Sequence, residues 1–214
     1  FFKIFNFIRR NNPNIVEWIQ SLLLGSASAR PVSSVILVLI HYLFKNNPSL
    51  YIMTGIFSWI LSVYLITVIV KFFIEKNSIH IFSLLLLFPF FSTAIFSNPY
   101  LFTQYTLPII LWSLSLISLL TYVEDDNLIY YFIGWLLLIL SLLTLSYIFP
   151  LLVLTCFLPL IYNYSKNDIK QNLFNLKFIV KYFIPTILVA LIFLIYKIYL
   201  VKLYANISSI YGLS

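Results

Sequence analysis

The feature that most constrains this chain is a stretch without a single Lys, Arg, Asp or Glu, from residue 77 to residue 123. A membrane-spanning helix needs about 20 mainly apolar residues, so this stretch alone is long enough for two spans. Charged residues make up 9% of the chain and apolar residues 62%, whereas a soluble domain carries about 25% charged residues. The chain is therefore predicted to be an integral membrane protein.

Proline and charged clusters divide the apolar stretches into segments. Ser97-Asn98-Pro99 is a turn signal, the acidic run 124–126 ends the longest stretch, and Pro150 and Pro159 interrupt the next one. We expect an all-α, polytopic transmembrane bundle with six or seven membrane segments, several of them short or interrupted by proline. The segments are 31–45, 50–70, 79–96, 100–123, 128–148, 149–163 and 178–200, within a transmembrane domain of 31–204 that follows an interfacial or loop segment of 1–30 and precedes a tail of 205–214.

The direction of insertion depends on how often the region 128–163 crosses the membrane. If all seven segments cross, one side holds most of the Lys and Arg residues between segments. The positive-inside rule then makes that side cytoplasmic. If 128–163 crosses once, every later segment changes sides and the bias weakens. The connections that share a side in the first case are 1–30, 71–78, 124–127 and 164–177.

Composition also excludes several classes of site. The net charge of +7 comes from scattered Lys and Arg between apolar runs, which suits phospholipid headgroups, so we predict membrane lipids and no nucleic acid as partners. The 4 glycines are isolated and form no phosphate-binding loop. One Cys and 2 His exclude a Cys/His zinc site. No cofactor is predicted; the run Glu124-Asp125-Asp126 is either a site for a divalent cation or a solvated loop.

Arg30 is the most informative charged residue. It directly precedes Pro31 and an apolar helix, and proline is favoured at the first helical position. A planar guanidinium at a helix start suits a phosphate, although Lys and Arg also serve there as ordinary interfacial anchors. His41 lies about three turns further along the same segment, as a substrate ligand or an interfacial ring. Glu17, beside Trp18, is either a general base or part of a solvated amphipathic face.

The four-residue connection 124–127 predicts that 100–123 and 128–148 are antiparallel neighbours, because a short connection forces adjacency. With few glycines available, close contact between these helices is expected at small side chains. Those are Ser113, Ser115, Ser118, Gly134 and Ser141.

Several segments together resemble one known layout. Trp18 followed by Gly25-Ser26-Ala27-Ser28-Ala29-Arg30-Pro31-Val32 resembles the tryptophan and Gly-Arg-Pro segment of polyprenyl-phosphate-sugar-dependent membrane glycosyltransferases. The run from Ser97-Asn98-Pro99 to Tyr105 resembles the Ser-Pro segment of that class, which ends in an aromatic residue. Leu145-Ser146-Tyr147 resembles its Leu…Tyr segment. The chain is most similar to the O-antigen glucosyltransferase family of bacterial inner membranes.

This resemblance implies an activity and a set of residues. The enzyme would move a sugar such as glucose from a polyprenyl-phosphate donor to a lipid-linked or surface glycan, for instance O-antigen, at the bacterial inner membrane. Arg30 would bind the donor phosphate, with His41 and Tyr105 as further substrate-binding candidates. The family's acceptor-side acid is expected upstream of Phe1, which leaves Glu17 as the catalytic candidate within this chain.

A second class of function stays open from the sequence. The chain could be a flippase or permease for lipid-linked glycans, or a non-catalytic membrane subunit. Transporters usually place ionisable residues in mid-span, whereas the charges here lie between the predicted spans or near their ends, which favours the enzyme.

Overall fold

The computed structural model describes residues 31–44, 47–74, 99–144, 150–166 and 176–211, and every regular element within them is an α-helix. Three helices are long and apolar enough to cross a membrane: Pro48–Lys71, Thr106–Asp125 and Val180–Tyr199. Leu128–Thr144 and Leu151–Asn163 are shorter apolar helices. The described helices are α3 (Pro31–Phe44), α4 (Pro48–Lys71), α7 (Pro99–Asp125), α8 (Leu128–Thr144), α9 (Leu151–Lys166) and α10 (Leu176–Tyr211).

Asparagine side chains define two of the helix starts. Asn47 has an extended backbone, and its side-chain oxygen accepts from the Ser49 N–H at 3.1 Å, with Pro48 at the first helical position of α4. Asn127 accepts in the same way from the Ile129 N–H at 3.0 Å, at the start of α8. Both contacts satisfy donors that the first helical turn leaves unpaired. These local signals fix the two boundaries.

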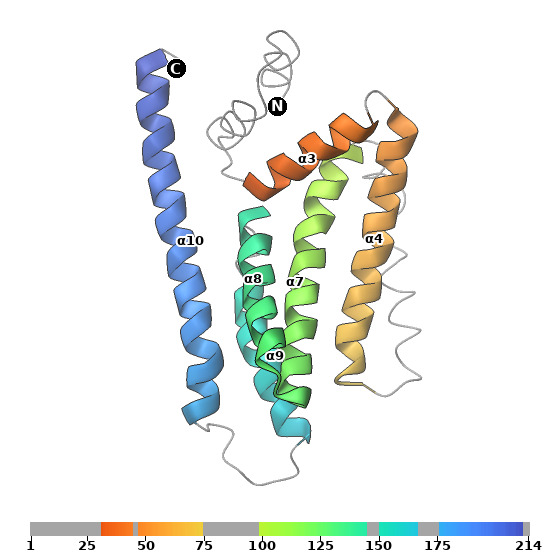
Figure 1. Cartoon of the computed structure of the whole chain (residues 1–214), viewed down its shortest axis with the longest axis vertical. Helices are drawn as coiled ribbons and strands as arrows, with labels where there is room; N and C mark the ends of the chain where they lie inside the picture. Colours follow the sequence, from red (N-terminus) through yellow and green to blue (C-terminus); the bar gives the residue numbers. More distant parts are fainter. Residues whose placement is uncertain (1–30, 45–46, 75–98, 145–149, 167–175, 212–214) are drawn as a thin grey trace.

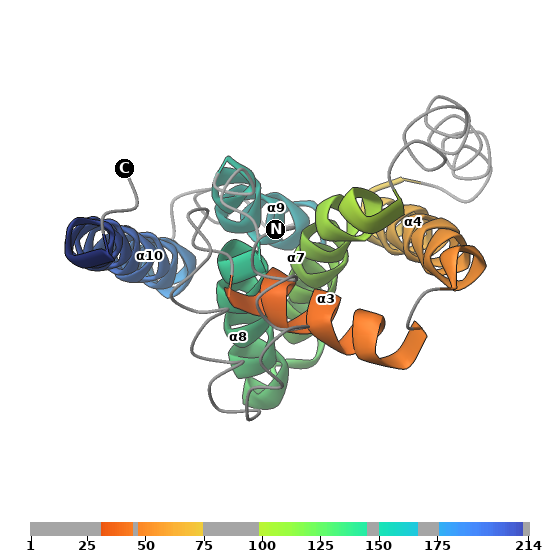
Figure 2. The ribbon, with the colours of Figure 1, turned by 90° about the horizontal axis from the view of Figure 1, so that it is seen from above.

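Five of the helices run along one common direction, and α3 lies across one end of them (Figure 1). α4, α7 and α9 run one way, and α8 and α10 run the other way. Viewed from above, α3 extends from the end of α8 over α7 toward α4 (Figure 2). We call this end of the bundle the α3 end. The opposite end contains the turn between α7 and α8.

α7 is the central helix of the described bundle. It packs most extensively against α8 and α4, and also contacts α9 and α3. Its fully buried Leu116, Leu119 and Leu120 form the middle of the core. α10 packs on α8 and α9 through Tyr182, Val189 and Phe193. Outward-facing side chains of α4 and α10 are also large and apolar, as expected for a surface in contact with lipid.

The helices agree with most of the predicted segments. α4, α7, α8, α9 and α10 correspond to the segments predicted from residue 50 onward, except for 79–96 and 145–149, which lie outside the described residues. α7 and α8 are antiparallel neighbours as predicted. Pro159 does not divide α9, because an apolar helix can keep its course through a proline when neighbours satisfy the freed carbonyl. α10 continues through the predicted tail as far as Tyr211.

α3 differs from its predicted role. Its 14 residues extend about 21 Å, which is short for a hydrocarbon core of about 30 Å, and it lies across the bundle. The predicted grouping of 1–30 with 71–78, 124–127 and 164–177 on one side falls largely outside the described residues and stays a prediction. α8 and α9 run in opposite directions, and both are shorter than the three described helices that are long enough to cross a membrane.

Candidate functional site

Two of the predicted site residues lie on helices that meet at the α3 end. His41 lies in α3, and Tyr105 lies in the second turn of α7, which α3 contacts. The fold thus brings together the two helices that carry these residues, which are far apart in sequence. For both residues the structure gives the helix position and not the side-chain contacts. Glu17 and Arg30 lie outside the described residues, although Arg30 immediately precedes the first residue of α3.

An apolar groove opens between α8 and α10, with a volume of about 300 Å³. Its α8 side belongs to the last two turns of that helix, and these end at the α3 end of the bundle. The lining residues are Ile139, Leu142 and Leu143 from α8, and Val189, Ile192, Phe193 and Tyr196 from α10. A groove with this lining can hold a hydrocarbon chain and offers little to a charged ligand.

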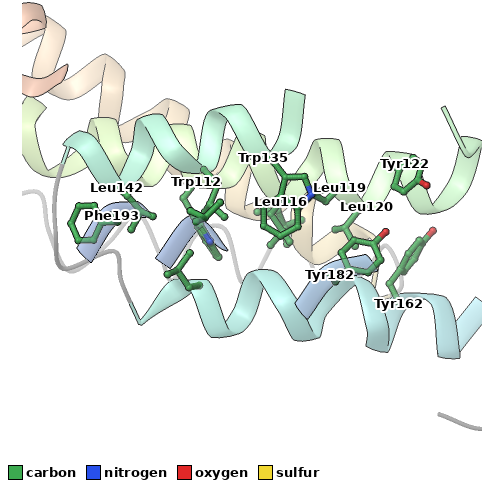
Figure 3. Packing of buried hydrophobic residues seen from close by; sticks show 14 residues of the cluster. Trp112, Leu116, Leu119, Leu120, Tyr122, Trp135, Leu142, Tyr162, Tyr182 and Phe193 are labelled. Atoms are coloured by element: carbon green, nitrogen blue, oxygen red, sulfur yellow. The ribbon is translucent and has the colours of Figure 1, made fainter. Parts of the chain in front are cut away.

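The opposite end of the bundle contains a cluster of tyrosines. We use the term tyrosine cluster for Tyr122, Tyr131, Tyr162 and Tyr182. Figure 3 shows three of them together at one end of the row of core side chains, with Leu142 and Phe193 at the other end. The rings of Tyr122 and Tyr131 lie 5.1 Å apart. Tyr182 is fully buried.

Charged groups connect the tyrosine cluster to the ends of the helices. The Tyr162 hydroxyl donates to the Glu124 carboxylate, which ties α9 to the end of α7. The Lys181 ammonium lies 3.7 Å from the Asp126 carboxylate and 4.2 Å from the centre of the Tyr122 ring. These contacts join α10 to the turn between α7 and α8.

The acidic run 124–126 is therefore partly engaged with side chains of other helices. Glu124 contacts a tyrosine and Asp126 a lysine. Within the described residues, no three His, Cys, Asp or Glu side chains lie close enough together to hold a metal ion. The contacts at this end of the bundle attach α9 and α10 to the end of α7 and the turn that follows it.

Hydroxyl groups make the polar contacts between helices in the interior. Thr106 Oγ1 donates to Ser58 Oγ at 2.8 Å, which joins α7 to α4. Trp112 Nε1 donates to Thr155 Oγ1 at 2.9 Å, which joins α7 to α9. Cys156 Sγ lies 2.8 Å from Thr186 Oγ1, between α9 and α10. Each hydroxyl can also bond within its own helix, so no charged group has to be buried.

The predicted small residues do hold α7 and α8 together. Ser115 Oγ donates to the Gly134 carbonyl at 2.7 Å, and Ser141 Oγ donates to the Pro108 carbonyl at 2.8 Å. Ser113 is also fully buried, whereas Ser118 is half-buried. The contact between α4 and α7 was not anticipated from the sequence. The sequence feature that could have predicted this contact is the series Gly55, Ser58 and Ser62, small residues that lie on one face of α4.

Comparison with known proteins adds no further assignment. No family model, no curated protein and no solved structure matches this chain.

Proposed function

We propose that this chain is a multi-pass glycosyltransferase of the bacterial inner membrane. It moves a sugar, such as glucose, from a polyprenyl-phosphate carrier to a cell-surface glycan such as O-antigen. The motifs around Arg30, Pro99 and Tyr147 support the family, and the long apolar helices support the membrane location.

One structural observation carries the proposal. α3 begins over the end of α8, and the last turns of α8 form one side of the apolar groove. A polyprenyl-phosphate sugar has a long apolar tail joined to a charged headgroup. The groove offers an apolar surface for the tail. The start of α3, with Arg30 next to it in the sequence, offers unpaired backbone N–H groups and a guanidinium for the phosphate.

The reaction is a displacement at the anomeric carbon of the donor sugar. A hydroxyl of the acceptor attacks this carbon, the bond from the carbon to the phosphate oxygen breaks, and polyprenyl phosphate leaves with the bonding electrons. A carboxylate accepts the hydroxyl proton, and Glu17 is the candidate within this chain. Arg30 stabilises the charge that develops on the leaving phosphate. His41 and Tyr105 are the candidates that bind the sugar or the acceptor, and the contact between α3 and α7, the helices that carry them, supports this assignment.

The directions of the helices support a multi-pass arrangement. α4 and α7 run the same way. This is the arrangement expected if the chain crosses once more between them, as the predicted span 79–96 requires. Six membrane segments would then be traversed in alternating directions from α4 to α10, with α3 at the interface.

The character of the interior favours an enzyme over a permease. The buried polar side chains of the described helices are Ser and Thr, and Lys181 and Glu124 lie near helix ends. Ion and substrate pathways through transporters usually contain ionisable side chains in mid-span. A donor site at one end of the bundle needs no ionisable side chain in mid-span.

Replacement of Arg30 by Lys tests the proposal. Lysine keeps the charge and loses the bidentate geometry, so we expect Arg30→Lys to lower transfer by about 10²–10³-fold at normal abundance. The assay is transfer of labelled glucose from polyprenyl phosphate to glycan in membranes containing the full chain, divided by the amount of protein. Arg9→Lys is the matched control and should retain transfer. Wild-type transfer by Arg30→Lys would show that Arg30 is only an anchor.

A further inference from the structure

Proline 185 lies inside α10 and removes one of its backbone hydrogen bonds. Proline has no N–H, so the carbonyl four residues earlier, that of Lys181, has no partner within the helix. Between membrane helices such a carbonyl must find another donor, because lipid offers none. The donor here comes from a different helix: the Tyr131 hydroxyl of α8 bonds to the Lys181 carbonyl at 2.9 Å.

The two parts of α10 on either side of this proline are attached differently. Before it, Lys181 pairs with Asp126, and Tyr182 is fully buried in the tyrosine cluster. Just after it, Thr186 contacts Cys156. From 187 to 199 the buried side chains are the apolar Val189 and Phe193, and both border the groove.

The difference between the two parts of α10 is important because the helix is surrounded by lipid. Apolar contacts between helices gain little in a bilayer, since lipid tails are as apolar as the side chains themselves. Polar contacts and close packing therefore decide where α10 is held. α10 is tied by polar contacts to α8, α9 and the turn between α7 and α8 at 181–186, whereas further along a groove of about 300 Å³ separates it from α8.

We infer that α10 is hinged at Pro185, that its part beyond the hinge is a movable wall of the groove between α8 and α10, and that Tyr131 is the positioning residue that sets the hinge. Loss of the hydroxyl leaves the Lys181 carbonyl unsatisfied, and the helix then bends to expose this carbonyl to another donor. Proline is a usual site of sharp helix bends. The inference does not depend on the proposed function, because it concerns helix positions alone.

The size of the motion follows from the helix geometry. Ile195 lies ten residues beyond Pro185, about 15 Å along the axis. A bend of about 20° at the proline moves it by about 5 Å. Spin labels report a shift of this size as a change in their distance distribution. Leu136 on α8 and Ile195 on α10 are both exposed and accept labels without disturbing the core.

The experiment measures the distance from Leu136 to Ile195, and from Leu136 to Val180 before the hinge, in the purified full chain in bilayers. Tyr131→Phe keeps the ring and removes the hydroxyl. We expect it to shift or broaden the first distribution by about 5 Å and to leave the second unchanged. Tyr130→Phe, at an exposed neighbouring position, is the control and should change neither. The buried Cys156 stays in place, and the chain without added cysteines checks that it takes no label.

Pro185→Ala completes the test. Alanine restores the N–H that bonds to the Lys181 carbonyl, so Tyr131→Phe should have no effect in this background. An unchanged distance to Ile195 in Tyr131→Phe would overturn the inference. So would an equal shift with and without Pro185, or a shift of both label pairs together, since each would mean that Tyr131 packs the whole helix and sets no hinge.

Discussion

Gly134 of α8 lies in close contact with α7, and replacing it with alanine tests the packing of this pair. A Cβ atom at this position would lie 2.7 Å from Leu119 Cγ, 2.8 Å from Leu119 Cδ2 and 3.2 Å from the Ser115 carbonyl oxygen. Leu119 is fully buried, so its side chain has no free space to move into. The added methyl group must therefore push the two helices apart.

The expected loss of stability follows from opposing contributions. Alanine is about 1 kcal/mol better than glycine in a helix interior. Forcing one extra carbon into a packed core costs about 1–3 kcal/mol. Separation of the helices also weakens the bond from Ser115 to the Gly134 carbonyl, and such bonds contribute about 0.6 kcal/mol in membrane proteins. We expect Gly134→Ala to lower the free energy of unfolding by about 1–2 kcal/mol.

The assay is reversible unfolding in mixed micelles by added SDS, followed by tryptophan fluorescence. Ile133→Ala, at the neighbouring lipid-facing position, is the control and should change stability by less than about 0.5 kcal/mol. Combining Gly134→Ala with Leu119→Ala should cost less than the sum of the two single changes, by at least about 1 kcal/mol. Additive costs, or a stabilising Gly134→Ala, would refute the close approach.

Three further substitutions, at two positions, probe a hydrogen bond and a backbone conformation. Thr155→Val removes the acceptor of the Trp112 indole N–H and should lower stability by about 0.6 kcal/mol, with a shift of the Trp112 indole proton resonance; an unmoved resonance would contradict the bond. Asp126 has a φ of 51°, in the left-handed region, so Asp126→Gly should be neutral within about 0.5 kcal/mol. Asp126→Val should cost about 1–2 kcal/mol in the same unfolding assay, and equal stability of these two variants would argue against this backbone conformation.

Much of the helical framework could be predicted from the uncharged stretches and from the prolines and charged residues that separate them. The acidic run and Asn127 place the turn correctly, so that α8 begins at Leu128 as expected. This worked because charges and turn-forming residues are costly inside a membrane and concentrate at helix ends. The antiparallel pairing of α7 and α8 followed from the short connection alone.

The faces of the helices could not be predicted in the same way. In α4 and α10 nearly every position is apolar, so hydropathy does not distinguish a face that contacts protein from one that contacts lipid. Tyrosine is common at membrane interfaces, so its presence in α10 does not predict that Tyr182 is buried against other helices. Pro185 was a usable signal, because a proline inside a membrane helix requires an external donor, but the sequence alone does not name Tyr131.

The candidate substrate residues were predicted from the order of short motifs along the chain and not from any spatial arrangement. His41 and Tyr105 lie on helices in contact, as a common site requires, while the position of α3 across one end of the bundle was not foreseen. A 14-residue apolar segment is compatible with a tilted span or with a helix lying at the surface. Only packing against the ends of α7 and α8 distinguishes these possibilities.

The two-residue turn at Asp126 and Asn127 has a consequence for biosynthesis. Closing so short a connection costs little chain entropy, so α7 and α8 can pair soon after α8 leaves the ribosome. The contact of Thr106 with Ser58 joins residues 48 positions apart, and α10 is synthesised after all the other described helices. The hairpin of α7 and α8 is therefore the template on which α4 and α10 assemble, and the groove exists only once α10 has docked.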